Sequence, residues 1–449
     1  MAPARAAGRV DVSARGEHLA AAESGGGAGF ERVVGRWQIL GLSINDVVGS
    51  GIYLLPAATA LLLGPASLWA VLLAGLAVCL LVLTYAQAAS YFDQPGGSYL
   101  YAREAFGPFI GFEVGWMIWL TRVASAAALS NGLAAAVAHV WPAAKDGLGQ
   151  ATVVTVSLVL LTVVNVVGVK AAARFGIALV VGKLVPLLLF VLLGAFHADW
   201  SLALAVGLPP LGNLGEAALL LLFAYAGFEN IPAAAGEYRN PRRDVPFALV
   251  TMIVVVTLLY AAVQLVAQGT LPGLAQSSTP LADAAAGFGG AWFALLLTVG
   301  ATVSILGTTS NTMLLGPRFL YALAADGFGP RVLARIHPRF HTPAVAIVVQ
   351  GVIALALALS GSFVALALLS VVTRLVAYIG TCVAVLVLRR RHGHRPGALQ
   401  LPGGAAIPVA ALVLSLGLLA SASLANLAAG AVAMLVGAGI YLVQRRAAG

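Results

Sequence analysis

Long apolar stretches recur along almost the whole chain, and they constrain its fold more than any other feature. They begin near residue 37 and continue to near residue 443. Each is roughly 20 residues long, which is the length of helix that crosses the hydrocarbon core of a bilayer. Apolar residues make up 61% of the chain and charged residues only 9%. This is too few charges for the surface of a soluble protein, so we expect a membrane protein with no sizeable soluble domain.

Polar residues, glycines and prolines divide the apolar sequence into twelve spans. The predicted spans are 37–61, 67–91, 109–140, 151–168, 176–195, 214–235, 246–268, 291–316, 342–360, 363–388, 407–421 and 425–443. Helices pair all of their backbone groups internally, as the bilayer requires, and the spans lack the alternation of barrel strands. We therefore predict an all-α polytopic membrane protein with twelve transmembrane helices.

Basic residues mark one side of the predicted spans. The amino terminus, the even-to-odd connections and the carboxyl terminus carry Arg5, Arg9, Arg15, Arg32, Arg36, Arg103, Lys170, Arg174, Arg239, Arg242, Arg243, Arg331, Arg335, Arg339, Arg389, Arg390, Arg391, Arg395, Arg445 and Arg446. The opposite connections contain one basic residue, Lys145. Because basic connections stay in the cytoplasm, we expect both termini there. Residues 1–35 lack the apolar core of a signal peptide and are predicted to be a disordered cytoplasmic tail ahead of a transmembrane domain at 36–449.

Two predicted helices contain the same break signal. In the first span Gly51 is followed five residues later by Pro56, and in the sixth span Gly227 is followed five residues later by Pro232. Glycine and proline both weaken a helix, and matched interruptions point to an inverted repeat with a binding site at the membrane midplane. The repeats would cover about 37–195 and 214–388, with peripheral helices at about 407–443. The alternative is that glycine and proline are simply common in membrane helices.

Several motifs in order resemble one family of transporters. They are GSGIY at 49–53, QPGGSYLY at 94–101, NVVGVK at 165–170, FAYAGFE at 223–229, NPRRDVP at 240–246 and RFLYALAADG at 318–327. Together they resemble the amino acid–polyamine–organocation (APC) transporters, of the amino acid permease type, over nearly everything after residue 35. The resemblance implies a LeuT-like fold and secondary transport of amino acids or related amines. Gln87 stands where the family usually carries Glu, and Asp46 where the position is usually uncharged.

A buried amino acid needs donors for its carboxylate and acceptors for its ammonium, and broken helices supply both. The expected carboxylate donors are backbone amides beside Gly49, namely those of Ser50, Gly51 and Ile52, aided by the helix dipole. The expected ammonium acceptors are the carbonyls of Ala224, Ala226 and Gly227. The family resemblance implies the same assignment. Phe223 beside the second break is expected either to gate the substrate or to serve only in packing.

Two carboxylates within the spans have open roles. Asp46 lies one turn before Ser50, on the same helix face. It either faces the site, where it would favour a cationic side chain or a polyamine, or pairs with Arg122 or Arg374. Glu229 either titrates during transport or braces the second break by accepting freed amide groups.

Lys183 is the expected coupling residue, with Glu229. It lies nine residues beyond Arg174, or about 13 Å along a helix, and is deeper than an ordinary interfacial lysine. It either extends toward water or points at the inner half of the first break and at the eighth span. The resemblance supports the second arrangement, because some family members carry a lysine at the matching position and are proton-coupled. A protonated Lys183 would donate to carbonyls near Gly49 and hold the break closed.

Other classes of function find little support. The Gly25-Gly26-Gly27 run lacks the lysine of a phosphate-binding loop, and the histidines lie outside the span interiors. Cys79 and Cys382 imply no disulfide or metal site. We expect no enzyme, cofactor, metal or nucleic-acid partner. We expect instead a secondary active transporter of amino acids or amines in the cytoplasmic membrane. Its expected partners are the small-molecule substrate, protons and the lipid bilayer. An exchanger, or a non-transporting sensor on the same scaffold, is the alternative.

Overall fold

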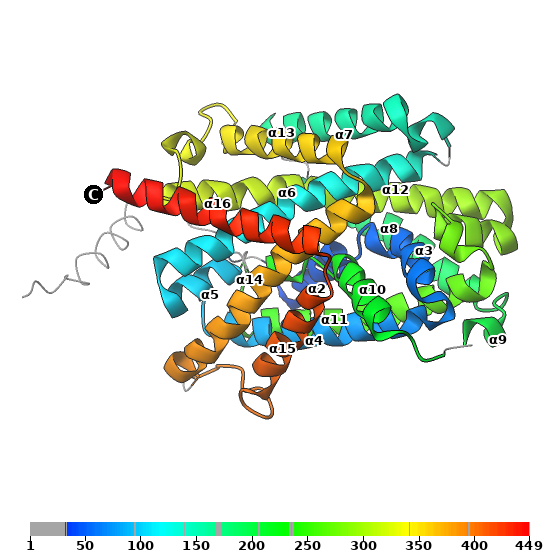
Figure 1. The fold of residues 1–449 in the computed structure, drawn as a ribbon, viewed down its shortest axis with the longest axis horizontal. Helices are drawn as coiled ribbons and strands as arrows, with labels where there is room; N and C mark the ends of the chain where they lie inside the picture. The colour runs from blue at the N-terminus through cyan, green and yellow to red at the C-terminus, as the bar shows by residue number, and fades with distance from the viewer. Residues whose placement is uncertain are drawn as a thin grey trace, which may run out of the picture.

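The computed structural model describes residues 32, 34–93, 96–138, 140–167, 172–204, 207–232, 235, 238–340, 342–393 and 396–448. Over these residues the structure is helical and has no strand, and one isolated β-bridge joins Val34 to Tyr238. Figure 1 shows long helices packed alongside and across one another in a single bundle. The all-α prediction is confirmed.

Each predicted span coincides with helical structure. The helices are α2 (Arg36–Val47) with α3 (Gly51–Leu63), α4 (Ser67–Ala89), α6 (Pro108–Ala138), α7 (Gly147–Val167), α8 (Ala172–Gly194), α10 (Leu211–Ala224), α11 (Pro241–Thr270), α12 (Pro280–Ala325), α13 (Ala344–Ser360), α14 (Phe363–His392), α15 (Ala406–Ala420) and α16 (Leu424–Ala448). The connections hold α5 (Gly97–Phe106), α9 (Trp200–Ala203) and short 3-10 turns. Within α12, Gly290 has a non-helical φ of 72°, so the helix bends one residue before the predicted start of the eighth span.

Within the described ranges, seven helical stretches are long and apolar enough to cross a membrane. They are Gly51–Ala89, Pro108–Ala138, Gly147–Val167, Pro241–Thr270, Pro280–Ala325, Phe363–His392 and Leu424–Arg445. Four further predicted spans contain shorter apolar helices, at Val181–Gly194, Leu211–Ala224, Ala344–Ser360 and Ala406–Ala420. The count of twelve crossings therefore stays a prediction.

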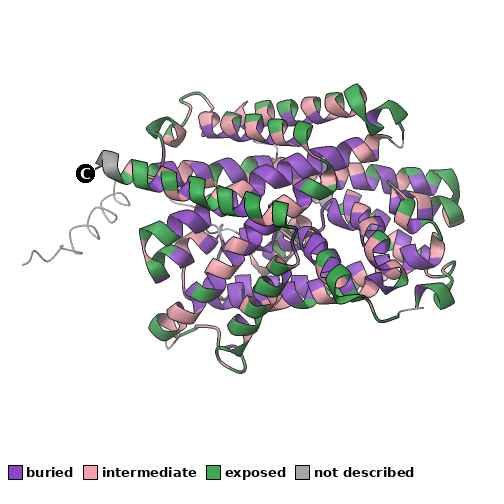
Figure 2. Cartoon of the chain, viewed as in Figure 1, coloured by how far each residue is buried: buried purple, intermediate pink, exposed green. Residues whose placement is uncertain are grey.

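Burial separates a central helix from peripheral ones. In the most apolar window of α6, 83% of residues are buried, whereas the figure for α16 is 17%. Figure 2 shows the same contrast, with exposed residues along α16 and on the outer faces of α7 and α13. Large apolar side chains such as Leu435 (72% exposed) lie on these outer faces. Such surfaces are stable against lipid and unfavourable in water.

The helices pack in pairs that relate the first five predicted spans to the next five. Helix α4 packs on α11, α6 on α12 and α7 on α13. The contact of α6 with α14 has its counterpart in that of α12 with α8, and the contact of α10 with α4 in that of α3 with α11. Exchanging the two halves reproduces these contacts, as a repeat would require.

Some predicted features lie outside the described residues. Apart from Arg32, Val34 and Gly35, this holds for the tail predicted at 1–35. It also holds for Gln94, Pro95, Gly168, Val169, Lys170 and Glu237 of the family motifs.

Candidate functional site

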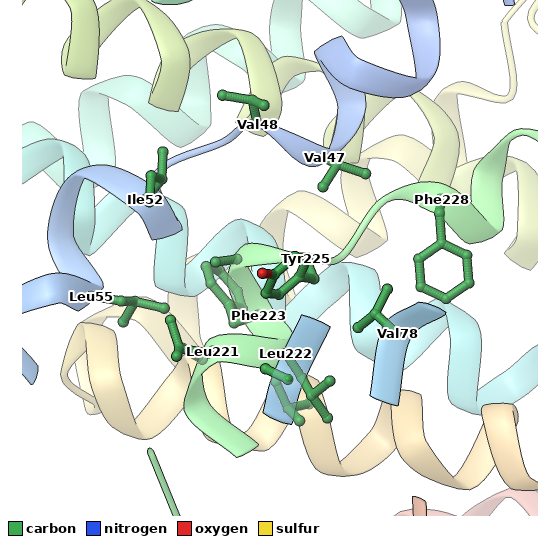
Figure 3. Packing of buried hydrophobic residues seen from close by; sticks show 14 of the residues in the cluster. Val47, Val48, Ile52, Leu55, Val78, Leu221, Leu222, Phe223, Tyr225 and Phe228 are labelled. Carbon is green, nitrogen blue, oxygen red and sulfur yellow. The ribbon is translucent and has the colours of Figure 1, made fainter. Parts of the chain in front are cut away.

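The first helix is broken between α2 and α3, as predicted. Helix α2 ends at Val47, Val48 is extended with φ −72° and ψ 90°, and α3 begins at Gly51. Figure 3 shows Val48 on this extended link and Ile52 on the first turn beyond it. The first amides of a helix have no carbonyl partner within it, so the start of α3 presents free donors. The Ser50 hydroxyl beside them is buried and has no hydrogen-bond partner in the described part of the chain.

The carbonyls at the end of α2 are taken by side chains of other helices. The Lys183 ammonium of α8 donates to the Asn45 carbonyl. The Tyr260 hydroxyl of α11 lies 3.1 Å from the Val47 carbonyl oxygen, and the Ser304 hydroxyl of α12 donates to that of Val48 over 3.4 Å. The break is therefore fixed on its carbonyl side and open on its amide side.

The second break follows α10. That helix ends at Ala224, Gly227 has a φ of 129°, and a 3-10 turn, η3 (Phe228–Asn230), comes next. Figure 3 places Tyr225 and Phe228 on either side of the break. The break predicted within 214–235 is present, but the half-helix expected after it is wrong, because no α-helix resumes among the described residues before Pro241. A positive φ favours glycine and ends the helix, and Pro232 lacks an amide donor.

The two breaks touch each other through their backbones. A Cβ on Gly51 would lie 2.5 Å from the Ala224 Cα, and one on Gly227 would lie 2.7 Å from the Asp46 carbonyl oxygen. The Tyr260 hydroxyl, 3.1 Å from the Val47 carbonyl, is also 2.9 Å from that of Ala224. Because Gly51 and Gly227 have no side chain, the two backbone segments can come into contact at these positions. From the sequence we had expected a ligand, and not the other segment, to occupy this space.

A small cavity lies where the breaks meet. Its volume is about 30 Å³, which is room for water, so a larger ligand requires the lining helices to separate. It is lined by Asp46, Val47, Gly49, Ser50, Gly51, Arg122, Ser125, Leu129, Phe223, Ala226, Gly227, Thr308, Thr312 and Arg374. Seven of the eleven residues predicted for the site are among these. Of the other four, Ile52 and Ala224 are buried next to lining residues, and Lys183 and Glu229 are buried behind the lining.

Glu229 is held between two arginines and braces the second break. Its Oε1 lies 3.1 Å from Arg122 Nη2 and 3.1 Å from Arg374 Nε. Its Oε2 accepts from the Gly227 amide at 3.0 Å and from the Tyr378 hydroxyl at 2.9 Å. This is the bracing arrangement that the sequence left as one of two alternatives.

Asp46 lines the cavity and is not paired with an arginine. Its Oδ2 accepts from the Asn230 amide at 2.6 Å, and its Oδ1 accepts from the Asn311 amide of α12. The alternative in which Asp46 pairs with Arg122 or Arg374 is wrong for this structure. Glu229 lies directly between the two arginines and takes both of them.

Lys183 points inward rather than toward water. It is 2% exposed, its ammonium donates to the Asn45 carbonyl, and its own carbonyl accepts from the Tyr53 hydroxyl at 2.6 Å. The carbonyl it reaches belongs to Asn45 in the last turn of α2, four residues before Gly49, where carbonyls near Gly49 were the expected partners. Lys183 therefore joins α8 to the inner half of the first broken helix.

The cavity includes residues that were not among the predicted site residues. Thr308 and Thr312 of α12 both line it. Their spacing at i and i+4 beside Asn311 was the available signal. Tyr260 carried no signal, because a tyrosine in an apolar helix resembles any packed aromatic.

A bundle of long apolar helices, with two broken helices around a buried polar cavity, defines a multi-pass membrane transporter. The chain belongs to the amino acid permease family, because the model of that family matches residues 34–442. The family resemblance drawn from the motifs is thereby confirmed, and the family consists of transporters and not enzymes.

Curated relatives agree with this assignment. The branched-chain amino acid permease BcaP of Bacillus subtilis (strain 168) is 28% identical over 450 residues, covering 95% of each chain. The serine/threonine exchanger SteT of the same organism is 29% identical over 423 residues, covering 91% of this chain and 95% of its own. A methylthioribose transporter, also from that organism, is 28% identical over 398 residues, covering 84% and 86%.

Proposed function

We propose that this protein is a secondary active transporter that moves amino acids or related amines across the cytoplasmic membrane by alternating access. Membership of the amino acid permease family supports the substrate class. The single observation that carries the mechanism is the meeting of two broken helices at a buried polar cavity. Because that cavity is small, substrate enters only when the lining helices separate, as alternating access requires.

The substrate carboxylate binds at the start of α3. Its donors are the amides of Gly51 and Ile52 with Ser50, whose buried hydroxyl lacks a partner among the described residues. A helix amino terminus favours an anion through its free amides and its dipole.

The substrate ammonium binds near the second break. Tyr260 has one hydroxyl proton but lies within hydrogen-bond distance of two carbonyls, those of Val47 and Ala224. One of these carbonyls therefore lacks that donor at any moment, and an ammonium can supply it. Ala226 and Gly227, which follow Ala224 closely in the sequence, line the cavity and supply further carbonyls. Asp46 adds a negative charge within the lining.

The scaffold is an inverted repeat, with helices 1–5 at about 37–195 and helices 6–10 at about 214–388 in a twelve-helix protein. The packing of α6 on α14 supports this repeat, because exchanging the two halves turns it into the packing of α12 on α8, which is also present. The peripheral helices at about 407–443 cover the repeats. One bundle rocks against the other around the fixed site.

Lys183 couples transport to protons. When protonated it donates to the Asn45 carbonyl and holds the inner half of the first broken helix against α8. Loss of that proton releases the contact and favours the other access state.

The coupling proposal is tested by uptake at a series of pH values, with and without sodium. We expect uptake to depend on pH and not on sodium, and Lys183→Ala to abolish the pH dependence. Lys145→Ala, at an exposed position, is the matched control and should behave as wild type. Sodium-dependent uptake, or a Lys183→Ala profile like that of wild type, contradicts the proposal.

Both termini are proposed to lie in the cytoplasm, because the basic residues gather on one side. Single cysteines at Gly207 and Gly273, which are exposed in the two connections expected outside, should react with an impermeant thiol reagent added to whole cells. A cysteine at Gly397 should react only after lysis. The reverse pattern contradicts the topology.

Radiolabelled uptake into proteoliposomes tests the function itself. We expect accumulation of at least one amino acid above protein-free vesicles. Exchange is the second candidate, favoured by the similarity to a serine/threonine exchanger. It would appear as uptake only into vesicles preloaded with substrate. No uptake of any amino acid or amine under either condition contradicts the proposal.

A further inference from the structure

Two buried arginines line the cavity, and each has a donor that no group in the described part of the chain accepts. Arg122 is 4% exposed and Arg374 is 2% exposed. Their contacts are with Glu229, with Asn230 for Arg122, and with Ser125 for Arg374 at 3.4 Å. Among the described residues, Arg122 Nε and Arg374 Nη1 have no acceptor. Buried guanidinium donors without acceptors are unfavourable, so a ligand acceptor at this position is stabilising.

The charges around the cavity do not balance. In the described part of the chain, the charged side chains at or directly behind the lining are Arg122, Arg374, Lys183, Asp46 and Glu229. With all of them ionised, three positive charges face two negative ones. Among the described residues, Glu229 forms the ion pairs with both arginines. Asp46 instead accepts hydrogen bonds from two asparagine amides. An uncompensated charge within a membrane is costly unless a partner arrives.

The class of substrate that corrects the imbalance follows from its charge. A neutral amino acid brings one carboxylate and one ammonium and leaves the excess unchanged, whereas a cationic side chain increases it. An acidic side chain removes the excess and provides the acceptor that the two guanidinium groups lack.

We propose that the site prefers amino acids with a second acidic group, and that Arg374, together with Arg122, receives that group. The inference rests on the proposed transport of amino acids and names the kind of amino acid. It revises the expectation from the sequence that Asp46 selects a cationic side chain, because both arginines line the same cavity as Asp46.

The variant that separates this role from a structural one is Arg374→Gln. It leaves Arg122 and Glu229 as a balanced ion pair 3.1 Å apart, so no buried charge of this pair lacks a partner and the protein is expected to fold. Arg374→Lys keeps the positive charge and serves as the conservative replacement. Arg391→Gln is the matched control on the same helix, because Arg391 is exposed and its hydrogen bond among the described residues goes to the Glu104 carbonyl.

The experiment measures uptake of radiolabelled glutamate and of radiolabelled serine by each variant in proteoliposomes. A parallel competition series uses aspartate, leucine and arginine in both chloride and gluconate buffers. In the wild type and Arg391→Gln we expect glutamate and aspartate to compete best. Arg374→Gln should lose at least about tenfold more in apparent affinity for glutamate than for serine, as expected for loss of one charge-assisted contact. Arg374→Lys should recover part of that loss.

Several results would overturn the inference. One is a wild-type protein that takes up serine or leucine and whose uptake is not inhibited by acidic amino acids. This result would leave the proposed function intact. Another is an equal loss for glutamate and serine in Arg374→Gln, which marks Arg374 as structural. A requirement for chloride without any acidic preference assigns the excess charge to an inorganic anion. Absence of uptake for every amino acid removes the proposed function and this inference together.

Discussion

The two broken helices differ in how the protein satisfies the backbone groups that each break frees. At the first break the carbonyls of Asn45, Val47 and Val48 receive donors from α8, α11 and α12, and the amides at the start of α3 remain. At the second break the Gly227 amide is taken by Glu229, the Ala224 carbonyl shares the Tyr260 hydroxyl with that of Val47, and the Ala226 carbonyl has no donor among the described residues. One break therefore offers donors and the other offers acceptors. This polarity matches the two ends of an amino acid.

The breaks also differ in what holds them. The first is held by side chains from separate helices, each making one contact with a carbonyl. The second is held by its own Glu229, which two arginines and Tyr378 fix in place. A movement of α8 or α12 can thus alter the first break alone, whereas the second is part of one buried network. The first break is accordingly the better candidate for the moving part.

The largest expected effect comes from filling the contact between the breaks. In Gly227→Val the side chain meets the Asp46 carbonyl, and valine does not adopt the φ of 129° found there. We expect uptake below detection. Gly41→Val, where no atom lies within 4 Å of an added Cβ, should transport normally. Ordinary kinetics in Gly227→Val would show that the breaks do not meet as described.

The next largest effect separates the two ways of holding a break. Glu229→Gln leaves two buried arginines without a carboxylate, and breaking such a network costs about 3–5 kcal/mol of stability. We expect a large fall in the melting temperature of the purified protein. Lys183→Ala, which removes one contact at the first break, should lower it much less. Equal shifts in the two variants contradict the proposed difference between the breaks.

A smaller effect is expected for Asp46→Asn. The substitution keeps the side-chain shape but removes the negative charge that the ammonium of every amino acid would meet. We expect apparent affinity to weaken by about tenfold for acidic, neutral and cationic amino acids alike. Loss confined to arginine, lysine and polyamines would instead mean that Asp46 selects the side chain, as the sequence alone suggested.

The smallest effect is expected for Tyr260→Phe, which removes the hydroxyl shared between the breaks. Loss of one neutral hydrogen bond costs about 1 kcal/mol, or roughly a fivefold change in apparent affinity. Tyr101→Phe, at a buried position of helix α5 outside the cavity lining, is the control. A change in the maximal rate of uptake without a change in affinity would assign Tyr260 to the conformational step and not to the ammonium.

Much of the fold could be predicted from the sequence because the bilayer imposes it. Apolar runs locate the helices, and the spacing from Gly51 to Pro56 and from Gly227 to Pro232 locates the breaks. The partners of the buried charges could not be predicted in the same way. From the sequence, either Asp46 or Glu229 could pair with Arg122 and Arg374. The packing of α6 and α14 around the second break selects Glu229.

The end of the second broken helix was also beyond sequence reasoning. A glycine and a proline show that a helix is weakened but not how far it unwinds, and here a 3-10 turn at Phe228–Asn230 follows the break. Lys183 was placed facing inward by its depth in the span and by the resemblance, but its carbonyl partner depends on how α8 packs and not on spacing.

Protection of a cysteine at Ser50 tests the central claim most directly. The Ser50→Cys variant, with Cys79 and Cys382 replaced by serine, is placed in proteoliposomes and treated with a small thiol reagent. We expect labelling to slow in the presence of a transported amino acid and to be unaffected by the corresponding amine without a carboxylate. Labelling that proceeds at the same rate with and without the amino acid would contradict a carboxylate site at the start of α3.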